Sequence, residues 1–237
     1  MKTLFRKELS SLFGSSLALG SFFFFHVFLV GLFWWIEGPY NLLSIGLNTP
    51  EPIFEILPYL YVFLICILSI PMVQNQLKDG TLVWMFSKPV TDFQIIFSKF
   101  LALLFFVVLS FFFVLTQFLG LSFFSDFSLD FGQIFSGFFG LFLVCAVFSS
   151  IGIFASSYGE QIAISALLGI FLCLVVFLGA YTLANLFSLN FIHFFGLNLN
   201  YLQSVKGILS LEFFFFSLFL MALFLALGVY NIEIKRR

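Results

Sequence analysis

Six long apolar runs divide the chain, and short polar stretches separate them. An apolar run of roughly 20 residues is long enough to cross a lipid bilayer as a helix. We therefore expect membrane-spanning helices over about residues 17–36, 57–73, 100–121, 131–155, 162–186 and 213–230. The pattern predicts an all-α polytopic membrane protein with one transmembrane domain over residues 1–237.

The first 16 residues have a different pattern, in which apolar residues recur at helical spacing and basic residues lie between them. Phe5 and Leu9 belong to the apolar side, and Lys2, Arg6 and Lys7 to the polar side. This pattern is typical of an amphipathic helix that lies in the membrane interface.

Composition and charge strengthen the membrane prediction. Hydrophobic residues make up 62% of the chain and charged residues 9%, whereas a soluble domain has about 45–50% hydrophobic and about 25% charged residues.

Six spans would place both termini on one side, and nine of the ten Lys and Arg residues fall on that side, with Lys206 opposite. Because basic residues accumulate on the cytoplasmic side, we expect cytoplasmic termini in a bacterial inner membrane.

The longest polar stretch between two spans covers residues 74–99 and lies on the same side as the termini. The helical spacing of its larger side chains predicts a short helix over 76–87. This helix should stop near Lys88, because the residue before a proline, here Pro89, disfavours the helical conformation. A plain polar connector is the alternative, but a connector does not need an apolar helix surface. We therefore interpret the stretch as a docking segment, whose candidate contact residues are Leu77, Gly80, Thr81, Trp84, Met85, Lys88 and Pro89, with Phe5 and Leu9 beside them.

Residues 91–94, Thr-Asp-Phe-Gln, fit a helix-capping box. In such a box the Thr91 hydroxyl accepts from the Gln94 amide, and the Gln94 side chain accepts from the Thr91 amide. We expect a new helix to begin here and to continue into the third span.

The docking segment also resembles a known family. The sequence reads Gly80-Thr81-Leu82, then Ser87-Lys88-Pro89-Val90-Thr91-Asp92-Phe93-Gln94-Ile95, then Lys99-Phe100-Leu101-Ala102. It is similar to the cytoplasmic coupling segment of type-2 ABC exporter permeases, and most similar to the gliding-motility-associated GldF branch. The outer segment of that branch is partly matched by Gly196-Leu197-Asn198-Leu199-Asn200-Tyr201 and Lys206-Gly207. Asn75, Gln76 and Val83 stand where the family tends to have acidic residues.

The resemblance implies a half-transporter that couples to a separate ATPase through residues 74–99. Its expected partners are a cytoplasmic ABC ATPase of the GldA type, a second permease or accessory membrane subunit of the GldG type, and the lipid membrane, with no nucleic acid. The chain itself would bind no cofactor, and ATP and Mg would be bound by the ATPase.

No catalytic motif was found that would make the chain an enzyme. Phosphate-loop, nucleophile-elbow and H-E-x-x-H patterns do not occur, and the two histidines are far apart in sequence. We expect no metal site. A non-transporting structural or anchoring subunit remains the alternative function, whereas an ion-coupled carrier is disfavoured because ionisable residues are scarce within the spans.

Three further features lead to structural predictions. His26 lies within the first span and either bonds to a backbone carbonyl or a neighbouring helix, or lines a substrate path. Gly132, Ser136 and Gly140 form a small-residue stripe for helix packing, within the chain or between subunits. Residues 187–211 are expected to form outer interfacial or re-entrant helices, and Cys66, Cys145 and Cys173 to be small core residues.

Overall fold

The computed structural model describes residues 1–41, 50–80, 90–124, 130–159, 161–187 and 196–236. Helices account for all the regular secondary structure of these residues. In chain order they are α1 (Lys2–Gly14), α2 (Ser16–Val30), the π-helix η1 (Gly31–Trp35), α3 (Glu51–Lys78), α5 (Asp92–Phe124), α6 (Phe131–Tyr158), α7 (Ile162–Phe187), α8 (Leu197–Val205) and α9 (Leu211–Arg236).

Six helical segments among the described residues are long and apolar enough to cross a membrane, as the sequence predicts. They are Ser16–Trp35, Glu51–Lys78, Asp92–Gly120, Phe131–Tyr158, Ile162–Gly179 and Leu211–Arg236. The second begins earlier than expected, because Glu51, Pro52 and Glu55 belong to α3 rather than to a loop. A proline and an acidic residue are well tolerated there, since the first helical turn has free N–H groups and a positive dipole end.

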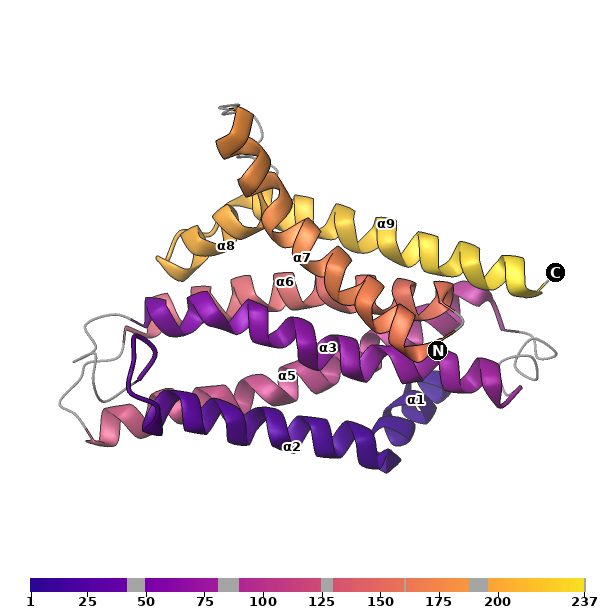
Figure 1. Cartoon of the computed structure of the whole chain (residues 1–237), viewed down its shortest axis with the longest axis horizontal. Helices are drawn as coiled ribbons and strands as arrows, with labels where there is room; N and C mark the ends of the chain where they lie inside the picture. Colours follow the sequence, from indigo (N-terminus) through magenta and orange to yellow (C-terminus); the bar gives the residue numbers. More distant parts are fainter. Residues whose placement is uncertain (42–49, 81–89, 125–129, 160, 188–195, 237) are drawn as a thin grey trace.

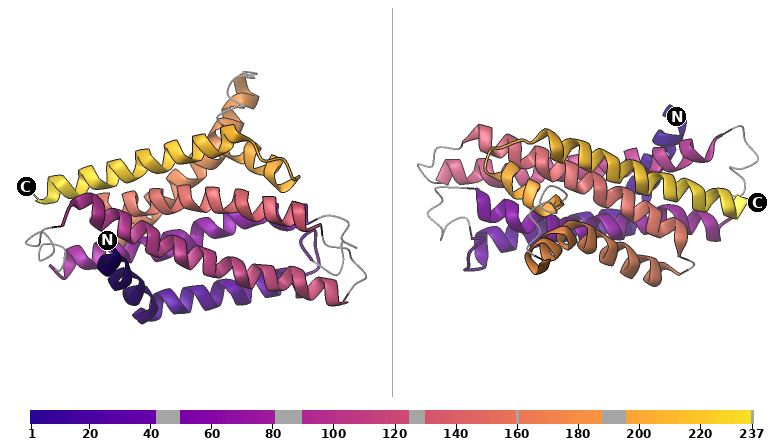
Figure 2. Two further views of the ribbon diagram at one scale, coloured as in Figure 1. Left: turned by 180° about the vertical axis from the view of Figure 1, so that it is seen from behind. Right: turned by 90° about the horizontal axis from the view of Figure 1, so that it is seen from above.

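The long helices lie side by side, and α7 is inclined to the others (Figure 1). Both termini, the end of α3 and the start of α5 lie at the same end of the bundle, which we call the terminal end (Figures 1 and 2). Most of the side chains of α3 and α6 are buried, whereas on α2, α7 and α9 most of the described side chains are half-buried or exposed. The bundle is therefore built around α3 and α6.

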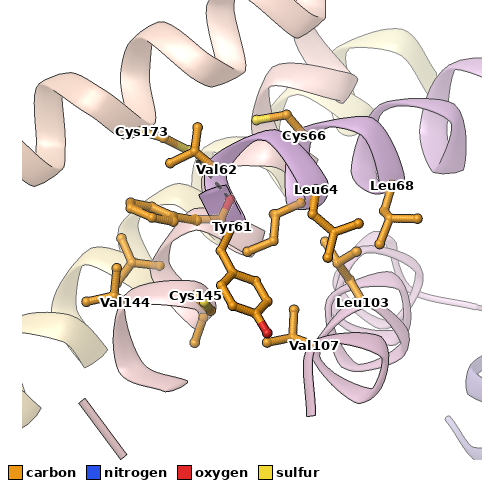
Figure 3. Packing of buried hydrophobic residues seen from close by; sticks show 14 of the residues in the cluster. Tyr61, Val62, Leu64, Cys66, Leu68, Leu103, Val107, Val144, Cys145 and Cys173 are labelled. Carbon is orange, nitrogen blue, oxygen red and sulfur yellow. Dashed lines mark hydrogen bonds between the residues drawn. The ribbon is translucent and has the colours of Figure 1, made fainter. Parts of the chain in front are cut away.

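The core consists of apolar side chains from every described helix, and its centre is formed by four of them. Tyr61 and Cys66 on α3 pack with Val107 on α5, Cys145 on α6 and Cys173 on α7 (Figure 3). All three cysteines are free thiols buried in this core, which confirms the prediction that they are small core residues.

Glycines on α6 allow close helix contacts within the chain. A Cβ atom at Gly140 would clash with Ser204 on α8, one at Gly152 with Ser69 on α3, and one at Gly137 with the Phe54 ring on α3. Of the predicted stripe, Ser136 is buried and Gly140 packs on α8, whereas Gly132 is exposed and lies beside the α6 N-cap, Asp130. Ser136 and Gly140 of the predicted stripe are therefore buried within the chain, and Gly132 is not.

Helix α8 is buried against its neighbours. Side chains on both faces of the helix are buried, because Asn198 and Asn200 are buried as well as Tyr201 and Val205. The helix ends at Gly207, whose φ of 92° is in the left-handed region. Hydrogen bonds from Gly207 N–H to Ser204 O and from Ile208 N–H to Gln203 O complete a Schellman motif. Of the outer segment over 187–211, residues 188–195 lie outside the described part, and α8 packs inside the fold rather than along its surface.

A proline in α3 creates the anchoring point for α8. Pro58 has no N–H, so the Phe54 carbonyl lacks its usual partner four residues ahead. The Tyr201 hydroxyl donates a hydrogen bond of 2.6 Å to this carbonyl. Burial raises the pKa of Tyr201 well above its usual value, so the phenol remains a donor. One side chain of α8 thus repairs a gap in the α3 hydrogen-bond ladder.

We expect Tyr201→Phe to destabilise the protein by about 1–3 kcal/mol, because it leaves the buried Phe54 carbonyl unsatisfied. Thermal unfolding of the full chain in detergent, followed by intrinsic fluorescence, measures the effect. Tyr158→Phe is the matched control, since Tyr158 is 61% exposed. Equal unfolding temperatures for the two variants would contradict this account of α8.

Candidate functional site

The polar stretch over residues 74–99 divides between two helix ends. Gln76, Leu77 and Lys78 are the last turn of α3, and Gly80, with a φ of 67°, ends the helix through its N–H bond to Leu77 O. A separate helix over 76–87 is therefore wrong for its first residues, because the left-handed turn interrupts it. The remaining candidate contact residues, Thr81, Trp84, Met85, Lys88 and Pro89, lie outside the described residues.

On the other side of this segment the capping box is present. Gln94 N–H donates to Thr91 Oγ1 over 3.3 Å, and Thr91 N–H donates to Gln94 Oε1 over 3.4 Å. Helix α5 begins at Asp92, directly after Thr91, and continues without a break to Phe124. Both parts of the prediction for residues 91–94 are confirmed.

A buried ion pair joins these two helix ends to α1. Lys99 Nζ on α5 lies 2.9 Å from Glu8 Oε2 on α1, and these side chains are 0% and 1% exposed. Lys99 also donates to Met72 O and Gln76 Oε1 on α3, each over 2.7 Å. Gln76 Nε2 in turn donates to both carboxylate oxygens of Glu8, over 3.1 and 3.2 Å. We call Glu8, Met72, Gln76 and Lys99 the clamp.

The clamp is complete in its hydrogen bonding. An ammonium group has three N–H donors, and the three partners of Lys99 use all of them. Burial of a charge costs several kcal/mol, and it is tolerated only when an opposite charge and well-placed hydrogen bonds compensate. The positions of α1, α3 and α5 at the terminal end are therefore coupled, since displacement of any one helix would leave a buried charge unsatisfied.

Sequence reasoning missed the clamp. It placed Lys99 among the charges of a polar stretch, although Lys99 is fully buried, and it did not single out Glu8. A signal was available in both helices. Glu8 shares the apolar face of α1 with Leu12, and Lys99 falls at helical spacing between Ile96 and Leu103, so each charge interrupts an apolar stripe.

The other described candidates for partner contact are half-buried. Phe5 and Leu9 of α1 and Leu77 of α3 pack against the core of the chain. Parts of their side chains remain accessible.

Further polar contacts join the remaining helices at the same end. Gln74 Nε2 on α3 donates to Gly159 O over 3.0 Å, at the end of α6, and also bonds Ser165 Oγ in the first turn of α7. Ser156 Oγ on α6 donates to Ile70 O on α3 over 2.7 Å. Buried polar side chains thus fix the turn between α6 and α7 onto α3.

Helix α9 is tied to this end by its basic residues. Lys235 Nζ donates to Ser157 O over 2.7 Å, where the carbonyl end of the α6 dipole favours a cation. Arg236 forms an ion pair of 3.1 Å with Asp92 in the first turn of α5. Since Arg236 is 38% exposed, this pair contributes little to stability but helps to set the position of α9.

Comparison with known proteins assigns no family. No protein-family model matches the chain, and a search of the curated proteins finds no match. The functional interpretation therefore depends on the residues and on their arrangement.

His26 belongs to a separate polar chain inside the bundle. Its Nδ1 lies 2.7 Å from Phe22 O, and its Nε2 lies 2.8 Å from Ser110 Oγ on α5. Tyr61 OH on α3 lies 2.8 Å from the same Ser110 oxygen. A neutral imidazole with its proton on Nδ1 satisfies every group, because Tyr61 donates to Ser110 and Ser110 donates to Nε2. The contacts with a backbone carbonyl and a neighbouring helix confirm the structural interpretation of His26.

The arrangement at the terminal end is suited to transmitting force. The segment 81–89 is connected to α3 on one side and to α5 on the other, and both helices meet α1 in the clamp. A load on the segment would act on three coupled helices, two of which continue through the bundle.

We expect Lys99→Met to destabilise the protein by about 3–5 kcal/mol, because it removes the buried cation 2.9 Å from the Glu8 carboxylate and leaves only the half-exposed Lys7, at 4.0 Å. The double variant Glu8→Met, Lys99→Met should recover most of this loss, since a well-packed apolar pair of similar volume is often neutral or better. Thermal unfolding in detergent compares the two, with Lys78→Met as the control because Lys78 is exposed. A double variant no more stable than Lys99→Met would show that the charge pair is not the source of the effect.

Proposed function

We propose that the chain is the transmembrane permease subunit of an ATP-driven transporter of the type-2 ABC exporter class. The single observation that carries the proposal is the clamp, which couples both helices flanking residues 81–89 to α1 through Lys99 and Glu8. A segment that only connected two spans would gain nothing from such coupling. A segment that receives force from a partner needs this coupling, because the force must be passed on to the spans.

In this proposal, energy enters from outside the chain. A cytoplasmic ATPase of the GldA type binds residues 81–89 together with the accessible parts of Phe5, Leu9 and Leu77, and it binds the ATP and Mg. Two permease subunits, identical or paired with a membrane subunit of the GldG type, complete the transporter. The chain lies in the bacterial inner membrane with both termini in the cytoplasm and works in gliding motility. The resemblance of residues 80–102 to the coupling segment of that family supports these assignments.

In the proposed mechanism, the clamp and the capping box make the helices at the terminal end move together. Closure of the ATPase displaces residues 81–89, and the capping box at Thr91 and Gln94 holds the start of α5 helical under this load. Because the clamp connects α5 with α1 and α3, the displacement moves the terminal end as a unit. The spans then change their inclination and open a path across the bilayer.

The test uses the chain co-expressed with a GldA-type ABC ATPase and reconstituted in nanodiscs. We expect Trp84→Ala and Met85→Asp each to reduce recovery of the ATPase with the chain at least about tenfold, because burial of one large aromatic or apolar anchor is typically worth 2 kcal/mol or more. ATP hydrolysis by the complex should fall in parallel.

Trp35→Ala is the matched control, since Trp35 is 83% exposed and belongs to η1, outside the terminal end. Unchanged recovery and ATP hydrolysis in Trp84→Ala and Met85→Asp would refute the coupling role. If the ATPase still binds but a hydrolysis-deficient ATPase leaves the cellular function of the chain intact, the chain is an anchoring subunit rather than a transporter.

A further inference from the structure

A cleft of about 330 Å³ lies at the terminal end, between α1, the start of α2 and the last three turns of α3. Its size is within the range of small-ligand sites. Met72 and Gln76 line the cleft and are also members of the clamp, so the clamp holds part of its wall in place.

Both walls of the cleft change from apolar to polar in the same direction. On the α3 wall, Leu68, Pro71 and Met72 are followed toward the helix end by Asn75, Gln76 and Asp79. On the opposite wall, Leu17 and Ala18 of α2 and Leu12 of α1 are apolar, Ser15 lies among them, and Ser11 and Lys7 follow toward the N-terminus of α1. A cleft with this gradient matches an amphiphile, with its apolar part toward the bundle and its polar part toward the terminal end.

The charges in the cleft restrict the polar part of the ligand. Lys7 lies on one wall and Asp79 on the other, so the lining has one cation and one anion. The ammonium of Lys7 and the hydroxyl of Ser11 can donate hydrogen bonds to a phosphate. The carboxylate of Asp79 can accept from an ammonium group, whereas it repels a second anion.

We propose that this cleft binds one phospholipid with a zwitterionic headgroup that carries a primary amine, such as phosphatidylethanolamine. The phosphate pairs with Lys7, the amine donates to Asp79, and the start of the acyl chains lies against Leu17, Leu68 and Pro71. The lipid comes from the leaflet on the side of the termini. This inference is independent of the proposed transport function.

The purified full chain is mixed in detergent with equimolar phosphatidylethanolamine, phosphatidylcholine and phosphatidylglycerol, and native mass spectrometry measures the bound lipid. We expect one phosphatidylethanolamine per chain in preference to the other two. Lys7→Ala should weaken its binding about tenfold, the effect of losing one charge-assisted hydrogen bond.

Asp79→Ala, which removes the acceptor, should abolish the preference over phosphatidylcholine, whose methylated amine cannot donate a hydrogen bond. Lys2→Ala is the control, because Lys2 is an exposed cation of α1 outside the cleft, and binding should be unchanged. Preferential binding of phosphatidylglycerol, or equal binding of all three lipids, would overturn the proposal. So would equal losses in Lys7→Ala and Lys2→Ala, which indicate general attraction to basic residues.

Discussion

The buried ammonium of Lys99 imposes the strictest constraint on this structure. It needs an anion and two further acceptors within hydrogen-bonding distance, and these come from two different helices, α1 and α3. An apolar contact can slide by an ångström at little cost, because dispersion and burial are not directional. A buried charge cannot, since its partners must keep their geometry. The relative register of three helices is thus set at one point.

The kind of contact between helices changes with distance from the clamp. Near the clamp, Gln74, Ser156 and Lys235 connect α3, α6, α7 and α9 through hydrogen bonds. Along the middle of the bundle the contacts are mainly apolar, and α6 approaches α3 closely at its glycines. Polar contacts there are fewer, and they include the chain of His26, Ser110 and Tyr61 and the bond from Tyr201 to Phe54. A change of helix inclination away from the terminal end would therefore break few polar contacts. This distribution is compatible with helices that pivot about the terminal end.

Much of the fold could be predicted from the sequence, because hydrophobic run length and capping chemistry are local signals. The six spans and the box formed by Thr91 and Gln94 required only neighbouring residues. The clamp depends on Glu8 and Lys99, which are 91 positions apart, and no local pattern states that they meet. The prediction of a helix over 76–87 was wrong for its first residues, because the apolar spacing continued across Gly80, whereas the backbone took the left-handed turn that glycine permits.

The repair of α3 by Tyr201 has a consequence for biogenesis. Phe54 lies early in the chain and is synthesised long before residue 201, so its carbonyl enters the membrane region without the partner that Pro58 denies it. The first turn of α3 cannot reach its final hydrogen-bonded state until α8 has been synthesised and has folded back onto α3. In a chain interrupted before α8, the Phe54 carbonyl would remain an unsatisfied acceptor. Completion of the second span thus depends on a residue that is synthesised only after the third, fourth and fifth spans.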